Sequence, residues 1–184
     1  MVNDFLPDPD DCPTKILSVK QFFRLWMMLP DYYQVRIPWQ IYSSYNDGFL
    51  LKTLYQNWKL YEDQTTSKWM IVIIKTTKGD IFGAFLDTVI IKTVKNYSGS
   101  SESFLFQFSK DKKEKYISQE CNNQYFVGGA DYLQIGGGGE GPAIFLKGTL
   151  QEGQSNESET FGNKILTSSG ESFFSVSMIE VIIV

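Results

Sequence analysis

The feature that most constrains the fold is a change in the hydrophobic pattern at residue 68. From there to the last residue, short apolar runs recur between turn residues, and several of them alternate with polar residues. In the run 103–109, phenylalanine occupies every second position, at Phe104, Phe106 and Phe108. This spacing places side chains on one face of a β-strand. The chain after residue 68 is therefore predicted to be mostly β-structure.

The expected strands follow these apolar runs. Residues 68–77 and 81–91 flank the turn sequence Lys-Gly-Asp, which is typical of a β-hairpin. The other predicted strands are 39–44, 103–109, 116–118, 124–127, 132–135, 143–146 and 173–184. Together they predict an α+β fold that is mostly β: a two-sheet antiparallel β-sandwich flanked by two helices from the N-terminal half of the chain.

Residues 18–30 predict the first helix. Ser18 and Gln21 have the spacing of a capping box, in which each side chain bonds a free backbone N–H of the first turn. Pro30 ends the helix, because proline cannot continue its hydrogen-bond pattern. The apolar residues at helical spacing are Val19, Phe22, Phe23, Trp26 and Leu29.

Residues 49–61 predict the second helix. The preceding sequence Asn-Asp-Gly at 46–48 offers N-cap residues. One amphipathic stripe is expected to face the core, formed by Phe49, Leu50, Thr53, Leu54, Trp58 and Tyr61.

A length of 184 residues favours a single domain. Residues 1–14 are acidic and interrupted by proline, which predicts a disordered tail before a folded domain over residues 15–184. Residues 150–172 predict a long polar connection. Within it, the acidic loop 151–159 is either a solvated loop or a docking segment.

Composition excludes several classes of function. The sequence contains no histidine, which removes Ser-His-acid and Cys-His nucleophiles and nearly all catalytic zinc sites. Its two cysteines, Cys12 and Cys121, are too few for a structural zinc site or a disulfide framework. No metal and no cofactor are therefore expected, and no catalytic residue is assigned.

Charge and hydropathy limit the partners and the location. A net charge of −4 disfavours nucleic-acid binding, which normally needs a basic face. The longest apolar run, 69–74, is much shorter than the roughly 20 residues that cross a bilayer. The N-terminus lacks the basic start and long apolar stretch of a signal peptide. We therefore expect a cytoplasmic protein that is not inserted into a membrane.

The glycine run at 136–139 formally matches the dinucleotide-binding pattern, because Gly136, Gly138 and Gly141 have its spacing. A phosphate-binding loop leads from a strand into a helix, whose N-terminus supplies N–H donors. Here Pro142 and a strand-like run follow, and Glu140 adds negative charge. The sequence thus favours a tight turn between two strands over a nucleotide site.

Glu180 is the most unusual charge, because it lies within the apolar run 173–184. Strict alternation places it on the same face as Phe174, Val176 and Met178. Either a β-bulge near Met178 changes the phase, or both faces are covered. Such a carboxylate is either structural, bound to Lys or backbone N–H groups, or a functional acid.

Ser44 and Asp47 lie where the strand 39–44 meets the second helix. Helix capping explains both residues, and a functional role is the alternative. The candidates for partner binding or another function are therefore Glu180, Asp47, Ser44, Gly137, Gly138 and Glu140.

These residues belong to a set of motifs that resembles the TLDc domain family from residue 16 to the last residue. The upstream segment 18–34 is similar to the one that introduces the domain in proteins that carry it after a TBC (Rab GTPase-activating) domain. The motifs are Tyr42-Ser43-Ser44 with Asp47-Gly48, Phe82-Gly83-Ala84-Phe85, the glycine run, Thr160-Phe161-Gly162-Asn163 and Ile179-Glu180-Val181.

The resemblance implies a β-sandwich with flanking helices, a role in resistance to oxidative stress, and no reaction of its own. It also implies binding to the peripheral sector of the vacuolar proton-pumping ATPase, whose assembly or activity such domains modulate on vesicle or endolysosomal membranes. Family members commonly continue past the Glu-Val pair with an aromatic residue and Gly-Phe, whereas this sequence ends with Ile-Ile-Val. Weaker or different ATPase binding is expected from that departure.

Two alternatives remain open. One is an accessory domain that acts with a TBC-domain or Rab protein in vesicle trafficking, as the upstream segment implies. The other is a carboxylate-based enzyme that uses Glu180, Asp47 or Glu140. That mechanism requires two acids in one cleft with separated pKa values.

Overall fold

The computed structural model describes residues 12–62, 68–92, 96–109 and 114–184, and most of this part of the chain is β-structure. The helices are α1 (Val19–Trp26), α2 (Asp31–Gln34), α3 (Ser44–Asp47) and α4 (Leu51–Tyr61). The strands are β1 (Trp39–Ser43), β2 (Met70–Thr76), β3 (Ile81–Leu86), β4 (Phe104–Gln107), β5 (Lys115–Ile117), β6 (Phe126–Gly128), β7 (Tyr132–Ile135), β8 (Ile144–Lys147), β9 (Glu152–Gln154) and β10 (Phe173–Ile183).

All ten of these strands form one antiparallel sheet. Its order is β5-β4-β3-β2-β10-β9-β8-β7-β6, and β1 pairs with the C-terminal half of β10. The prediction of a mostly β protein with two main helices, α1 and α4, is confirmed. Two separate sheets are not found. The reason is β10, which pairs with β2 over residues 176–183 and with β9 over 173–175, so that one strand joins the two halves.

The hairpin of β2 and β3 and all the other predicted strands are present. One strand is not predicted from the sequence: β9, which lies inside the predicted polar connection 150–172. Its three residues, Glu-Gly-Gln, carry no apolar alternation, and pairing with β8 and β10 holds them in the sheet. The connection is also well packed, since Ser155, Thr160 and Phe161 are buried. The interpretation of 151–159 as a plain solvated loop is therefore wrong for its buried residues.

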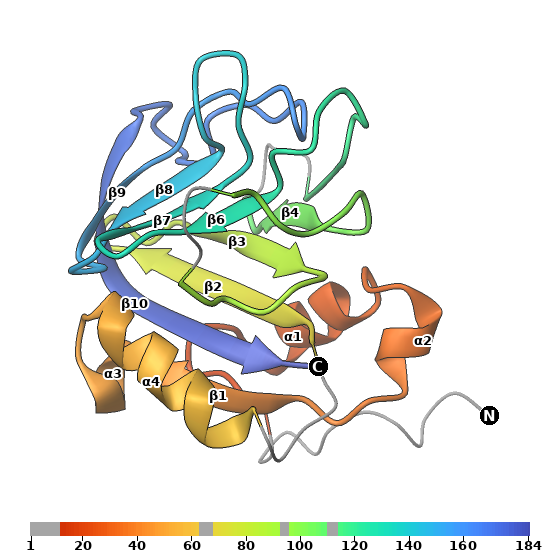
Figure 1. Cartoon of the computed structure of the whole chain (residues 1–184), viewed down its shortest axis with the longest axis vertical. Helices are drawn as coiled ribbons and strands as arrows, with labels where there is room; N and C mark the ends of the chain where they lie inside the picture. The colour runs from red at the N-terminus through yellow and green to blue at the C-terminus, as the bar shows by residue number, and fades with distance from the viewer. Residues whose placement is uncertain (1–11, 63–67, 93–95, 110–113) are drawn as a thin grey trace.

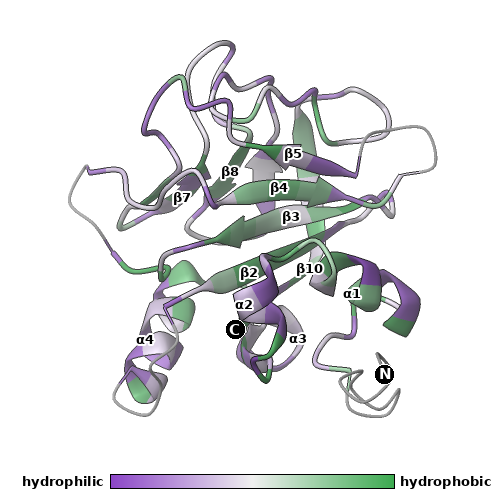
Figure 2. Ribbon diagram, turned by 90° about the vertical axis from the view of Figure 1, so that its right-hand side faces the viewer, coloured by the Kyte–Doolittle hydropathy of each residue, from purple (hydrophilic) through white to green (hydrophobic). Residues whose placement is uncertain are grey.

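The core consists of two clusters on opposite faces of β2, β3 and β4, the strands in which Figure 2 shows hydrophobic residues concentrated. The larger cluster lies between the halves of the sheet and includes Val72, Phe82, Leu133 and Leu146. In Figure 1 the β6–β9 half lies over β2 and β3. The smaller cluster joins the other face of these strands to α1 and α2. Its members include Ile71, Phe85, Phe104, Phe106, Leu25 and Tyr33.

Helix α1 forms as the sequence predicts, although it ends at Trp26 rather than at Pro30. The Ser18–Gln21 capping box is present in both directions. The buried face is narrower than the predicted stripe, since Val19 and Phe23 are exposed.

Helix α4 begins at Leu51, and the predicted caps at 46–48 do not cap it. Asn46 and Asp47 belong to the short helix α3, and Gly48 ends that helix with a φ of +74°. The buried face of α4 is Leu51, Leu54 and Trp58. Leu50, which the predicted stripe places in the core, is 53% exposed because it precedes the first helical turn.

The N-terminal segment contacts this fold from residue 12 onward, since Cys12 packs against the smaller core cluster and the Pro13 carbonyl accepts a hydrogen bond from Gln40. Residues 1–11 of the predicted tail 1–14 lie outside the described residues. Thr14, Ile16 and Leu17 are buried, and the latter two belong to the smaller core cluster. Among the described residues, no helix combines the length and the apolar character needed to cross a membrane.

Candidate functional site

The six candidate residues fall into two places in the structure. Ser44, Asp47 and Glu180 lie together where β1, α3 and β10 meet, because Glu180 is in register with Ser43. Gly137, Gly138 and Glu140 lie in the connection between β7 and β8, in the other half of the sheet. The sequence-based candidates therefore do not form one site.

Glu180 is fully buried and receives three hydrogen bonds from the N-terminal segment. The hydroxyl of Thr14 donates to Oε2 at 2.5 Å, the N–H of Lys15 donates to Oε1 at 3.0 Å, and the N–H of Ile16 donates to Oε2 at 3.4 Å. Thr14 Oγ1 also accepts from the N–H groups of Ile16 and Leu17. The carboxylate therefore fixes the turn through which the N-terminal segment joins the fold, as expected for a structural acid.

Both explanations proposed for the position of Glu180 hold. The register of β10 against β2 shifts between Val176 and Met178, so the bulge prediction is confirmed. Before the bulge, the even-numbered Val176 faces the larger core cluster. After the bulge, the odd-numbered Ile179 and Val181 face that cluster. Glu180 therefore faces the opposite side, where the N-terminal segment covers it.

Ser44 and Asp47 hold α3 in place. The Asp47 carboxylate accepts the N–H of Ser43 at 2.8 Å, and Ser44 Oγ accepts the N–H of Ile179 at 3.0 Å. The Asp47 carboxylate therefore satisfies the N–H of the residue before α3, and it does not cap α4. Ser44 ties the start of α3 to β10. Both side chains are occupied by backbone donors of the fold.

Tyr42 completes this junction. Its hydroxyl donates to the Gly48 carbonyl at 2.5 Å. Burial raises the pKa of Tyr42 to about 12, and the nearby Asp47 carboxylate adds to this effect. An unfolded tyrosine has a pKa of about 10. The folded state thus keeps the Tyr42 proton over a range of pH in which the unfolded chain loses it.

The free energy of unfolding is expected to fall as the pH rises from about 10 to 12. Below pH 10 Tyr42 is protonated in both states and its contribution is complete, whereas above pH 12 ionisation opposes the fold. A difference of about two pKa units corresponds to about 2.7 kcal/mol. Urea unfolding at several alkaline pH values measures the slope. Tyr42→Phe should make the slope shallower, and equal slopes in the variant and the unmodified protein would contradict the assignment.

The glycine run forms a tight connection between the antiparallel strands β7 and β8, as the sequence favours. Gly137 donates its N–H to Thr160 Oγ1 at 3.0 Å, and its carbonyl accepts the N–H of Thr160 at 3.2 Å. Gly138 has a φ of +71°, and a Cβ there would lie 2.5 Å from Glu159 Oε2. The space beside the glycines is filled by the chain itself, and no helix follows them.

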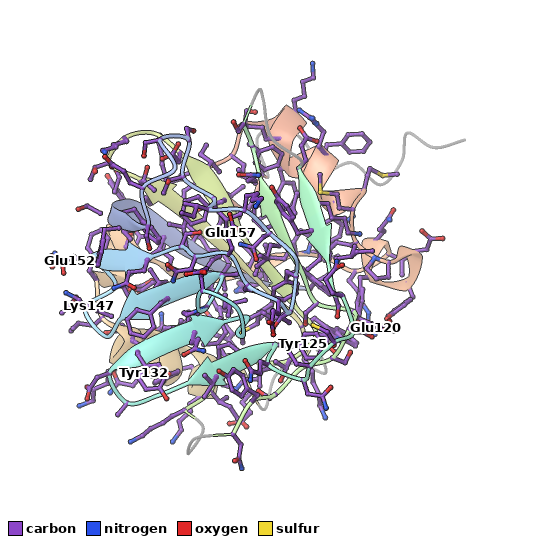
Figure 3. The ribbon with its side chains drawn as sticks, turned by 90° about the horizontal axis from the view of Figure 1, so that it is seen from above. Glu120, Tyr125, Tyr132, Lys147, Glu152 and Glu157 are labelled. Carbon is purple, nitrogen blue, oxygen red and sulfur yellow. The ribbon has the colours of Figure 1, made fainter. Side chains whose placement is uncertain are left out.

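Glu140 is exposed at the end of the same turn. Its backbone N–H donates to the Glu157 carbonyl at 3.2 Å. In the view of Figure 3, from above the β6–β9 half, Glu157 lies near the centre, and the ion pair of Lys147 and Glu152 lies at one edge. Glu140 thus lies in a different half of the sheet from Glu180 and Asp47. Within the described residues, no group of three His, Cys, Asp or Glu side chains could hold a metal ion.

A basic groove that the sequence analysis did not identify lies beside α4, with a volume of about 890 Å³. Its lysines come from α4, from the segment after β3 and from the end of β8. In the sequence, the only sign is the pair of lysines seven residues apart on α4, on one helical face. The residues that define this lysine groove are Lys52, Tyr55, Lys59, Lys92, Asp131 and Lys147.

Comparison with known proteins identifies relatives over most of the chain. Oxidation resistance protein 1 of Xenopus laevis is 34% identical over 165 residues, which are 89% of this chain and 18% of that protein. The human protein of that name is 32% identical over 172 residues, which are 92% of this chain and 18% of that protein. Nuclear receptor coactivator 7 of Mus musculus is 36% identical over 132 residues, which are 71% of this chain and 13% of that protein.

This chain therefore spans less than a fifth of the length of these relatives. Their names do not support the predicted similarity to proteins with a TBC domain. The TLDc domain family matches residues 11–184, which includes every motif used for the resemblance and all four helices and ten strands described above. The chain belongs to the TLDc domain family.

Proposed function

We propose that this chain is a protein-interaction domain that supports resistance to oxidative stress without catalysing a reaction of its own. Family membership and the relatives named oxidation resistance protein 1 support the link to oxidative stress. The domain acts by presenting a surface to a partner. A shaped surface also suits a sequence without histidine, the commonest general base at neutral pH.

The bonding of Glu180 is the observation that carries the non-catalytic role. This acid is the one that sequence reasoning singles out most strongly, and three donors of residues 14–16 occupy its oxygens. The rival enzyme would need a second acid in the same cleft. Asp47 is bonded to the Ser43 N–H, and Glu140 lies in the other half of the sheet. These arrangements favour binding over carboxylate chemistry.

The partner that we propose is the peripheral, cytoplasmic sector of the vacuolar proton-pumping ATPase. The family resemblance supports this partner, and binding would change the assembly or the activity of the pump. The domain would then work at the cytoplasmic face of vesicle or endolysosomal membranes that carry the pump. The alternative with a TBC-domain or Rab protein has only the α1 segment in its favour, so we do not adopt it.

Affinity capture and an ATPase assay test this proposal together. The immobilised chain is expected to retain the isolated peripheral sector, and adding the free chain is expected to change the rate of ATP hydrolysis by the assembled pump. If the chain neither retains the sector nor changes the rate of ATP hydrolysis, the ATPase is not the partner. Steady turnover of hydrogen peroxide or of a generic ester by the purified chain would instead support the enzyme.

A further inference from the structure

The lysine groove is built from parts of the fold that are held together by hydrogen bonds. The N–H of Leu51, at the start of α4, donates to the Gly148 carbonyl at 2.8 Å. The Tyr55 hydroxyl donates to the Gly129 carbonyl at 2.8 Å, and the Gly148 N–H donates to the Asp131 carbonyl at 2.6 Å. In Figure 1 the left-hand loops of the β6–β9 half lie just above α4. The walls of the groove are therefore fixed relative to each other.

The charge of the groove is opposite to that of the whole chain. The chain carries a net charge of −4, whereas the groove is lined by four lysines and one acid, Asp131. Lys147 forms an ion pair with Glu152 at the edge of the groove. Lys52, Lys59 and Lys92 are exposed and form no ion pair with any described residue. Such a concentration of one sign attracts a ligand of the other sign.

The lysines on α4 are arranged along a line. Lys52, Tyr55 and Lys59 lie on one face of the helix, because residues three to four positions apart share a face. Lys52 and Lys59 are separated by about 11 Å along the helix axis. In an extended chain, side chains four positions apart point to the same face and are separated by about 13 Å, a difference that the flexible lysine side chains can accommodate. Two carboxylates at that spacing can therefore approach both lysines at once.

The groove also offers apolar contact. The Tyr55 ring lies between the two lysines of α4, and burial raises the pKa of its hydroxyl, which stays protonated. The exposed Leu50 lines one end of the groove. An occupant that carries apolar side chains between its acids would bury this surface and gain hydrophobic stabilisation.

We propose that the lysine groove binds a short, extended, acidic segment of a partner protein, with acidic residues on either side of an apolar one. This inference rests on the proposed function as an interaction domain, and it specifies the surface and the chemistry of the partner. Lysines 52, 59 and 92 bind the carboxylates, and Tyr55 with Leu50 contacts the apolar side chain.

An anionic membrane fits these observations less well. A membrane presents a broad negative surface, which would repel the rest of a chain with a net charge of −4. A single peptide segment contacts only the groove and meets its lysines. Charge complementarity thus favours a peptide over a lipid surface.

Fluorescence anisotropy with a short labelled peptide of Glu and Asp around single Leu residues tests the proposal. The chain is expected to bind this peptide and not its Gln and Asn counterpart. Binding should weaken between low salt and ~0.3 M salt, because salt screens exposed charges. The double variant Lys52→Glu with Lys59→Glu should weaken it by about tenfold or more, since each attraction becomes a repulsion.

The matched control is Lys20→Glu with Lys68→Glu, which changes two exposed lysines outside the groove by the same charge. It should alter the affinity by less than about twofold. Equal losses in both double variants would contradict the proposal, as would equal binding of the neutral peptide. Vesicles with phosphatidylserine and free inositol hexakisphosphate are the other probes. Groove-dependent binding of either, without peptide binding, would assign the groove to a membrane or a phosphate.

Thermal melts establish that the variants fold. If Lys52→Glu with Lys59→Glu does not fold, the double variant Lys52→Gln with Lys59→Gln is used in its place. Capture of the ATPase sector separates this proposal from the proposed function. If the groove variant captures the sector as well as the unmodified chain does, the ATPase remains the partner and the groove is not its site. If the acidic peptide binds in the groove but the sector is not captured, the groove proposal stands and the ATPase is the wrong partner.

Discussion

Replacing Glu180 with alanine is expected to lower the free energy of unfolding by about 3–5 kcal/mol. The substitution removes the acceptor for the Thr14 hydroxyl and for the N–H groups of Lys15 and Ile16. Buried donors that lose their partner cost about 1–3 kcal/mol each, and only part of this is recovered when the segment moves into water. The variant should also expose Ile16, which packs in the smaller core cluster.

Urea unfolding followed by tryptophan fluorescence measures the loss, and amide hydrogen exchange locates it. Exchange is expected to accelerate first in residues 14–17, because this segment loses its anchor. Glu180→Gln keeps one acceptor oxygen and should cost less than the alanine variant. Glu171→Ala is the control, since Glu171 is an exposed acid whose ion pair with Lys78 lies at the surface. A loss in the Glu180 variant no larger than in this control would contradict an anchoring role.

The sequence predicts those parts of the fold whose signal is local. The alternation of Phe104, Leu105 and Phe106 gives both faces of β4 correctly, because the strand separates the two core clusters. The Ser18–Gln21 box predicts the start of α1, since both partners lie within one turn. The residues after the glycine run predict a strand, and the structure has β8 at that place.

The joining of the two halves of the sheet could not be predicted in this way. Strand β10 shows a bulge in its sequence pattern, but the pattern does not reveal that one strand pairs with both β2 and β9. Strand β9 itself has no apolar signal. Its place is set by pairing with β8 and β10, the strands before and after it in the chain, and not by an apolar pattern of its own.

The same distinction applies to the candidate sites. Glu180 is noticeable because a charge interrupts an apolar strand, yet its partner Thr14 is 166 residues away. The lysine groove collects lysines from three separate segments, and each lysine in its own segment looks like an ordinary solvated charge. The Lys-rich run 110–115 is the strongest basic signal in the sequence, but 110–113 lie outside the described residues and Lys115 contacts the Met28 carbonyl and the Phe104 ring.

Replacing Gly83 with alanine is expected to lower the free energy of unfolding by about 3 kcal/mol or more. Gly83 lies in the middle of β3 and pairs with Ile73 of β2 and Phe106 of β4. A Cβ at this position would lie 1.9 Å from the Val72 carbonyl oxygen and 2.8 Å from Phe106 Cζ. The carbonyl cannot move without opening the ladder between β2 and β3. Inserting a methyl group into a packed core typically costs about 1–3 kcal/mol, and a backbone clash adds to that.

Gly170 is the control that separates steric overlap from backbone conformation as the cause of the stability loss expected in Gly83→Ala. Gly170 has a φ of +74°, and a Cβ added there would have no atom within 4 Å, so Gly170→Ala should cost only the roughly 1–2 kcal/mol of a left-handed residue. Adding Phe106→Leu to Gly83→Ala removes the ring contact but leaves the clash with Val72. The double variant should therefore recover little stability in urea unfolding. Full recovery would show that the Phe106 ring, and not the β2 backbone, is what requires glycine in the Phe-Gly-Ala-Phe motif.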